Sequence, residues 1–428
     1  MKRIILPMLL ISATAIGQTK LRPAIDKQAT AIESKVIEWR RDFHEHPELG
    51  NQEVRTAKII ADHLRSLGME VTENVAVTGV VGVLKGGKPG PMVALRADMD
   101  ALPVTERVDV PFKSTVTATF NNQQTGVMHA CGHDSHVAIL MGAAEVLAGM
   151  KDQLEGSVKF IFQPAEEGVS DVEMAGAELM VKEGVMNDVD AIFGLHIWAQ
   201  VEAGKIGYRS GPSMAAVDIL GIDVHGTQAH GASPWSGVDP IVTSSQIVMG
   251  LQTILSRSVN ITQNPAIVTI GAIHGGIRHN IIPEKVEMIG TIRTFGAEQQ
   301  ALVHRRITEI ATNIAESAGA KAEVSITKLY PATINPPELT AKMVPSLKAA
   351  AGDANLIVMD PMTGSEDFSF FQQEKPGFFI FLGGMKKGAD PLKTPSHHTP
   401  DFYLDESGFI LGVRTLSYFV VDYMGMKK

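Results

Sequence analysis

The stretch Met92-Val93-Ala94-Leu95-Arg96-Ala97-Asp98-Met99-Asp100 begins as a short apolar run and passes directly into charged side chains. A run such as Met92 to Leu95 is typical of a strand buried on both faces of a sheet. The same change occurs in Phe160-Ile161-Phe162-Gln163-Pro164-Ala165-Glu166-Glu167 and in Phe193-Gly194-Leu195-His196. Polar groups that follow buried strands predict an open α/β sheet with a site at the carboxyl ends of its strands.

The order of the expected elements predicts two domains. Strands and helices alternate up to about residue 210, which favours an α/β domain with a mostly parallel sheet. The order then becomes βαββαβ, as in ferredoxin-like α+β domains. We therefore expect residues 214–328 to be inserted into a larger domain formed by residues 18–213 and 329–428. The expected strands of the insert are 217–224, 266–273, 285–293 and 322–327, and its helices are 239–257 and 298–317.

The N-terminus has the pattern of a secretory signal peptide. Met1-Lys2-Arg3 is followed by an apolar run from Ile4 to Ile16 and by Gly17, giving a charged start, a short hydrophobic middle and a small-residue end. The run is too short for an ordinary membrane span, although an uncleaved anchor is an alternative. We expect export to the periplasm or the medium, removal of residues 1–17, and no stable membrane span afterwards.

Composition excludes several classes of protein. A chain of 428 residues that is 44% hydrophobic and 20% charged is a globular protein long enough for two cores, and not a disordered or fibrous one. Its formal net charge of −9 argues against nucleic acid as a partner. Because Cys131 is the one cysteine, no intramolecular disulfide can form.

That cysteine lies in the stretch His129-Ala130-Cys131-Gly132-His133-Asp134-Ser135-His136. A lone cysteine is usually a small buried hydrophobe, but histidines two residues before and two after Cys131 favour metal ligation. Thiolate, imidazole and carboxylate groups bind zinc, cobalt, nickel and manganese, and a spare carboxylate can act as general base. With Glu166-Glu167 nearby, the sequence predicts a metal-dependent hydrolase. The helix expected from His133 to about Met150 has apolar positions that mostly suit one buried face.

Eight motifs, in order along nearly the whole chain after residue 17, carry a family resemblance. The sequence resembles metal-dependent amidohydrolases of the aminoacylase and carboxypeptidase type, in the branch of hippurate hydrolases, auxin-conjugate hydrolases and N-acetyl-amino-acid deacetylases. The motifs are RADMDALP (96–103), HACGHD (129–134), QPAEEG (163–168), GLH (194–196), HGASP (230–234), NIIP (280–283), GSEDF (364–368) and HTP (398–400).

The resemblance implies two close divalent metal ions, bridged by water or thiolate and held by Cys131, His133, Glu167, His196 and His398. It selects His398 over His397 because the family's ligand stands two residues before a proline, here Pro400. Taken alone, His196 would be equally well explained as a hydrogen-bonded core histidine. Mixed nitrogen, oxygen and sulfur ligands suit zinc or manganese, and also cobalt or nickel, so the sequence leaves the metal open.

Glu166 is the predicted general base. Adjacent carboxylates at a strand end point in different directions, so Glu167 can bind metal while Glu166 faces the attacking water and passes its proton to the departing nitrogen. A solvated Glu-Glu loop is the alternative, which the preceding buried strand disfavours. Asp98 and Asp100 are expected to orient imidazoles, and Asp134 to do the same or to cap a helix.

For the inserted domain the resemblance implies a lid and dimerisation role. His230 would stabilise the oxyanion, from the same chain or from the partner subunit of a homodimer or larger homo-oligomer. Asn280 and Arg293 are then candidates for binding the substrate's α-carboxylate, since Arg pairs well with planar carboxylates. A surface ion pair is the alternative for Arg293. The Gly275-Gly276 turn before Asn280 either positions that side chain or merely connects two strands.

These observations predict hydrolysis of an N-acyl amino acid, with an N-acetyl, N-benzoyl or similar acyl group, to a carboxylic acid and a free amino acid. The inserted domain would close as a lid. A second hypothesis keeps the metals but makes the protein a dipeptidase or carboxypeptidase that acts on a short peptide, and the sequence does not distinguish the two. A third hypothesis, an exported binding protein with a silent site, is disfavoured because Glu166 has no obvious use in binding alone.

Overall fold

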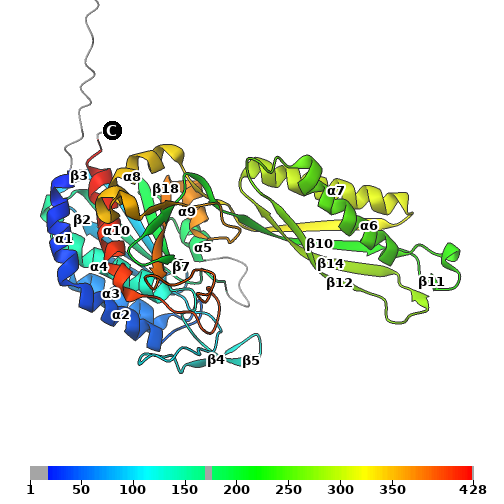
Figure 1. The fold of residues 1–428 in the computed structure, drawn as a ribbon, viewed down its shortest axis with the longest axis horizontal. Helices are drawn as coiled ribbons and strands as arrows, with labels where there is room; N and C mark the ends of the chain where they lie inside the picture. Colours follow the sequence, from blue (N-terminus) through cyan, green and yellow to red (C-terminus); the bar gives the residue numbers. More distant parts are fainter. Residues whose placement is uncertain (1–17, 169–175, 427–428) are drawn as a thin grey trace, which may run out of the picture.

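The computed structural model describes residues 18–168 and 176–426. The predicted signal peptide, residues 1–17, lies outside this described part. Figure 1 shows a larger body in which helices surround a sheet, and a smaller body to one side that contains β10, β12, β14, α6 and α7. Within the described residues, no helix combines the length and the apolar character that a membrane crossing requires.

The larger body is built on an eight-stranded mixed sheet. Its central strands β6, β3, β7 and β18 are parallel neighbours, which confirms the predicted fold class. The order across the sheet is β1 (Glu70–Val75), β2 (Gly79–Lys85), β6 (Glu155–Gln163), β3 (Lys88–Asp98), β7 (Ala191–Glu202), β18 (Gly377–Met385), β8 (Ile206–Tyr208) and β17 (Leu356–Val358).

The strands toward the sides of this sheet depart from the parallel pattern. β2 pairs antiparallel with both β1 and β6, and β8 is antiparallel to β18 but parallel to β17. The antiparallel pairing of β1 with β2 has a simple cause, because β1 ends at Val75 and β2 begins at Gly79. A parallel neighbour needs a crossover of a dozen or more residues, and this connection is far shorter.

Helices cover both faces of the large sheet, so the body has three layers. One core contains residues of α1 (Arg22–Ala31), α2 (Glu33–Glu45), α3 (Val54–Ser66), α4 (His133–Ala148), α8 (Pro337–Ala351) and α10 (Phe409–Met424). The other contains residues of α5 (Gly176–Lys182) and α9 (Phe368–Glu374). Val93 and Leu95 enter the first core and Ala94 the second, as the alternation of side chains along a strand requires.

Helix α4 is buried on nearly all sides rather than on one face, so the expectation of a single buried face was wrong. Met141 and Ala143 are as fully buried as Val137 and Leu140. The reason lies in the packing of the helical layer, because α4 contacts α1, α2, α3 and α10 as well as the sheet. This central position makes α4 a rigid support for the side chains at its N-terminal end.

The smaller body has the ferredoxin-like arrangement that the βαββαβ order predicts. Its antiparallel sheet has the order β12 (Ile267–Gly275), β14 (Lys285–Thr294), β10 (Ala216–His225), β15 (Lys321–Tyr330). Helices α6 (Pro240–Thr253) and α7 (Ala297–Ser317) pack on one face and share its core. α6 begins where Asp239 accepts hydrogen bonds from two backbone N–H groups and Pro240 takes the first helical position.

Short strand pairs complete the fold. β9 (Gly211–Met214) pairs with β16 (Thr333–Asn335), so the two chain segments that connect the bodies are hydrogen-bonded to each other. β11 (Ala229–His230) pairs with β13 (Ile281–Ile282) at the end of the smaller body farthest from the large sheet (Figure 1). A hairpin of β4 (Thr117–Phe120) and β5 (Gln123–Gly126) projects from the larger body.

Candidate metal centre

The carboxyl ends of the central strands meet the start of α4, and the five predicted metal ligands gather there. The Sγ of Cys131 lies 3.3 Å from Nε2 of His196 and 3.3 Å from Nε2 of His398. The same His398 nitrogen is 3.0 Å from a carboxylate oxygen of Glu167. His133 joins Cys131 and His196 in one group of closely spaced ligand atoms, and joins Glu166 and Glu167 in another.

The hydrogen bonds of the imidazoles show that this cluster fits divalent metals. Nδ1 of His133 is fixed by the backbone oxygen of Asp100 at 2.9 Å and by its carboxylate at 3.1 Å. Nε2 of His133 is buried and has no hydrogen-bond partner among the described residues. Nδ1 of His196 lies 2.6 Å from the carbonyl oxygen of Ile197. Metal-binding histidines are held in this way by one nitrogen while the other faces the metal.

The electrostatics of the cluster also suit metal binding. Burial and the neighbouring His136 lower the pKa of His196 well below its ordinary value, which keeps its imidazole in the neutral form that binds metals. Burial, together with Glu167 and Glu166, raises the pKa of the Cys131 thiol well above its ordinary value. A thiolate at this position therefore needs nearby positive charge, which two divalent ions would supply.

Glu166 lies beside the predicted ligands and is 8% exposed. Burial is the largest cause that raises the pKa of Glu166 well above its ordinary value, followed by the nearby Glu366 and Glu167 carboxylates. The hydroxyl of Tyr330, at the end of β15, donates a 2.9 Å hydrogen bond to the backbone oxygen of Glu166. A residue of the smaller body thus holds the loop that presents the predicted base.

A buried ionic network behind Glu166 was missed at the level of sequence. The guanidinium of Arg96 is 2.7 Å from Asp98, 2.7 Å from Asp367 and 3.0 Å from Glu366, and all four side chains are buried. Arg96 and the Glu366-Asp367 pair stand within two of the motifs, but no role followed from their spacing. The available signal was a charged residue placed inside a buried strand, since such a charge needs partners.

The predicted orienting carboxylates divide into three roles. Asp100 orients His133, as described above. Asp98 accepts from Nδ1 of His136 at 2.5 Å, and Nε2 of His136 accepts from a backbone N–H at 2.8 Å, so both nitrogens of His136 are occupied. Among the described residues, Asp134 pairs with none of the five predicted ligands. Its carboxylate contacts His44 at 2.6 Å and Arg40 at 3.0 Å, and accepts from a backbone N–H of the first turn of α4.

A pocket of about 520 Å³ opens over the predicted ligands and is lined by both bodies. The larger body contributes Trp198 and the smaller body contributes Arg293 from β14. The Nη1 atom of Arg293 is buried and has no hydrogen-bond partner among the described residues. Arg293 also makes no ion pair with any residue of 18–168 or 176–426, which argues against the surface ion pair considered for it.

His230 and Asn280 are not at this pocket in the same chain. They lie at or beside the short β11 and β13 strands, at the far end of the smaller body (Figure 1). The backbone N–H of Gly231 donates to the backbone oxygen of Asn280 at 2.9 Å, so the two segments are neighbours. The length of β10 and β14 separates both residues from the metal centre, which sequence spacing alone could not show.

Fold and site together define a metal-dependent hydrolase of amide or peptide bonds. Comparisons with known proteins agree with this class. Residues 94–422 match the model of Peptidase family M20/M25/M40, and the chain belongs to this family.

Three relatives illustrate the breadth of the family. Thermostable carboxypeptidase 1 of Saccharolobus solfataricus is 41% identical over 92% of this chain and 96% of its own length. The N-acetylcysteine deacetylase of Bacillus subtilis is 39% identical over 88% and 93% of the two chains. The crystal structure of the YXEP protein of Bacillus subtilis, a dinuclear metal-binding peptidase from the M20 family, matches with a TM-score of 0.77 and 35% identity over 92% and 99%.

Proposed function

We propose that this protein hydrolyses the amide bond of N-acyl amino acids to a carboxylic acid and a free amino acid. The observation that supports this most directly is the unpartnered guanidinium of Arg293 in the pocket that also contains Glu166. A free α-carboxylate is the substrate group that matches a half-buried Arg with an unpartnered Nη1, since paired charge-assisted hydrogen bonds satisfy both partners.

The charges of the pocket favour an acyl group over a free amino terminus on the substrate. A dipeptide carries an ammonium group, which needs an available carboxylate. The pocket carboxylates are Glu166, Glu167 and Glu366, of which the first is the proposed base, the second a proposed ligand, and the third is paired with Arg96. An N-acyl amino acid has no ammonium group and needs no carboxylate partner in the pocket. The ring of Trp198 offers an apolar surface for its acyl group.

In the proposed mechanism each group of this chain has one task. Cys131, His133, Glu167, His196 and His398 would hold two divalent ions, which polarise a carbonyl and make water more acidic. Glu166 takes a proton from the attacking water and delivers it to the departing nitrogen. Its raised pKa suits that task, because a buried carboxyl group can keep the proton between the two transfers. Arg293 orients the substrate through its carboxylate.

A carboxypeptidase activity is the second candidate. It is supported by the similarity to a thermostable carboxypeptidase, and a C-terminal peptide also presents a free carboxylate to Arg293. The two activities differ in what lies on the acyl side of the scissile bond, where Trp198 and the loops around Gly364 and His397 line the pocket.

A substrate panel separates these candidates. Release of free amino acid is measured from N-acetyl and N-benzoyl amino acids, dipeptides and N-blocked dipeptides, with protein loaded with zinc or manganese and with chelated protein. We expect metal-dependent turnover of the N-acyl amino acids and little turnover of dipeptides. Preference for N-blocked peptides would favour the carboxypeptidase. Absence of turnover on every substrate, with two metals bound, would contradict the proposed function and return the silent binding protein to consideration.

We also propose that His230 and Asn280 act in the pocket of a partner subunit of a homodimer. Both lie far from the pocket of their own chain, and His230 is exposed. The test mixes two inactive variants, His230→Ala and Glu166→Gln, after subunit exchange. A mixed dimer has one pocket with both intact residues, so activity should return. Absence of recovery in proven mixed dimers would exclude this arrangement.

Export is part of the same proposal, on the basis of the signal-peptide pattern of residues 1–17. N-terminal sequencing of the protein recovered outside the cytoplasm should begin near Gln18. An intact Met1 in membrane-bound protein would favour the anchor instead.

A further inference from the structure

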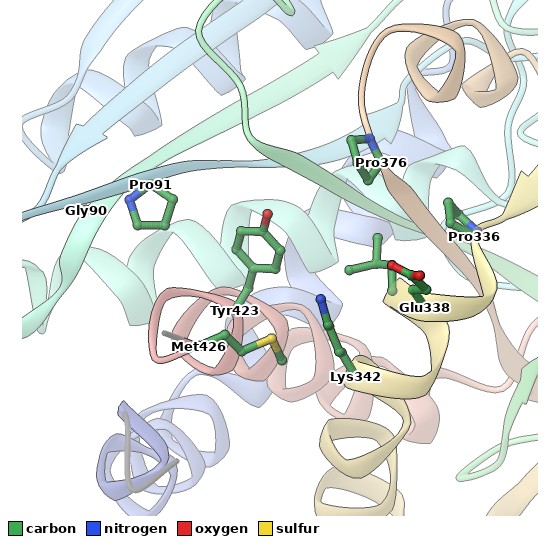
Figure 2. A pocket seen from close by; sticks show the side chains of 9 residues that line it. Gly90, Pro91, Pro336, Glu338, Lys342, Pro376, Tyr423 and Met426 are labelled. Carbon is green, nitrogen blue, oxygen red and sulfur yellow. The ribbon is translucent and has the colours of Figure 1, made fainter. Parts of the chain in front are cut away.

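A second cavity lies at the edge of the large sheet opposite the metal centre. It has a volume of about 640 Å³, which is within the range of pockets that bind small molecules. Its residues come from the amino end of β3, the segment before β18, the first turns of α8 and the C-terminal end of α10 (Figure 2). None of the predicted metal ligands or substrate-binding residues contributes to it.

Most of the wall of this cavity is apolar. The apolar side chains are Pro91, Pro336, Leu339, Pro376 and Met426. The ring of Tyr423 faces the same space (Figure 2), and burial raises the pKa of its hydroxyl, which stays uncharged. Three prolines restrict the backbone around the cavity, so the pocket is largely pre-formed. Ligand binding therefore costs little free energy for ordering the backbone.

Two opposite charges stand on one wall, Glu338 and Lys342, one helical turn apart on α8 (Figure 2). A Glu that precedes a Lys by four residues is the favourable order for an ion pair along a helix. Other i,i+4 pairs of this chain do close, such as Glu178 with Lys182 at 2.9 Å. The side chains of Glu338 and Lys342 are both exposed at the rim of the cavity, and neither makes an ion pair or a side-chain hydrogen bond with another residue that the structure describes.

We propose that this cavity binds a free α-amino acid with an apolar side chain. Its ammonium group would bind Glu338, its carboxylate Lys342, and its side chain the prolines, Met426 and the Tyr423 ring. An apolar carboxylate alone would leave Glu338 beside a like charge, and an apolar amine would do the same to Lys342. A zwitterion satisfies both groups at once. The ligand class follows from the side chains of the cavity. Only the statement that a free amino acid is also a product of this enzyme rests on the proposed function.

Calorimetric titration of chelated Arg293→Ala protein with L-phenylalanine and L-leucine tests this site, because the metal-centre pocket then lacks both the metals and the guanidinium proposed to bind an amino-acid carboxylate. Protein without metals does not turn over substrate, so the result is independent of the proposed function. We expect saturable binding of one amino acid per chain. N-acetyl-L-phenylalanine lacks the ammonium and phenethylamine lacks the carboxylate, so each should bind about tenfold more weakly or worse, because a charged hydrogen bond is lost.

Matched variants locate the binding. Lys342→Met and Glu338→Gln should each weaken L-phenylalanine binding about tenfold. Lys348→Met, made in the same Arg293→Ala background, changes a lysine of the same helix that pairs with Asp353 outside the cavity, and should leave the affinity unchanged. The proposal is overturned if L-phenylalanine gives no saturable binding, if its N-acetyl derivative binds equally well, or if Lys342→Met and Glu338→Gln both leave the affinity unchanged.

Discussion

The large sheet buries charged side chains at the carboxyl ends of its strands, whereas the small antiparallel sheet buries one apolar face and leaves the other in contact with solvent. Arg96, Asp98 and His133 are almost completely buried in the larger body. Between Ala216 and Tyr330, which the structure describes throughout, Asp218 is the one buried charge, held by Gln300 and His304. The paired buried charges of the larger body surround the predicted metal ligands and the predicted base. The small sheet serves mainly to place Arg293 and Tyr330 beside them.

The largest effect is expected at the buried base. Glu166→Gln keeps the size of the side chain but removes its ability to accept a proton, so kcat should fall by roughly 10²–10⁴-fold. Metal content and the melting temperature should stay near those of the wild type. Glu178→Gln is the matched control, since Glu178 pairs with Lys182 on the surface of α5. A kcat within about twofold of the wild type, on the order of 0.4 kcal/mol, would remove Glu166 from the mechanism.

The next prediction compares the buried charges of the two bodies. Arg96→Met leaves Asp98, Glu366 and Asp367 without their counter-charge and should lower the free energy of unfolding by about 3–5 kcal/mol. Asp218→Asn keeps most of its hydrogen bonds and should cost about 1–3 kcal/mol. Urea unfolding of chelated proteins measures both. Equal losses of unfolding free energy for the two variants would mean that buried charges contribute equally to the stability of the two bodies.

A smaller effect is expected for the Arg that the small sheet provides. Arg293→Ala should raise KM about 10- to 100-fold, because a charge-assisted hydrogen bond to the substrate carboxylate is worth about 1.5–3 kcal/mol. The effect on kcat should be minor if Arg293 binds the ground state and the transition state alike. Substrate amides that lack the α-carboxylate should show no difference between variant and wild type, and a difference there would contradict the assigned role.

Stability should also depend on pH through the larger body. His63 on α3 has its pKa lowered, first by burial. A lowered pKa in the folded state means that the native protein favours the neutral imidazole. The unfolded state therefore takes up a proton first as the pH falls below its pKa of about 6.5. The contribution of neutral His63 to the free energy of unfolding is complete above that pH and is lost below it. His63→Gln should flatten part of the decline of melting temperature between about pH 6.5 and 5. An unchanged profile would exclude His63 as a source of that decline.

The smallest effect is expected on the surface of the small domain. Glu309 on α7 pairs with Arg306 at 2.5 Å and approaches Arg305 at 3.7 Å, and all three side chains are at least one third exposed. Because water and salt screen such pairs, Glu309→Gln should change the free energy of unfolding by less than about 0.5 kcal/mol. A loss near that of Asp218→Asn would show that exposed charges matter as much here as buried ones.

Much of the fold followed from local patterns. The strands that lead to Asp98, Glu166 and His196 are visible as apolar runs with polar ends, and the βαββαβ order of the insert matches the observed strand order. The predicted ligands also come together, because each stands at a strand end or a helix start that the sheet brings to one edge. The antiparallel direction of β2 and the all-round burial of α4 were missed, since both depend on which neighbours pack beside an element.

The sequence by itself determined the chemistry that is available: a thiol among histidines, an adjacent carboxylate pair after a buried strand, and an α/β frame with a ferredoxin-like insert. Only the tertiary structure decided which distant groups meet. Arg96 finds Asp367, 271 positions away in the chain, and Arg293 enters the metal-centre pocket while His230 does not. Spacing along the chain fixes local geometry, but pairing across a fold depends on strand order and on the packing of buried surfaces, which no single motif contains.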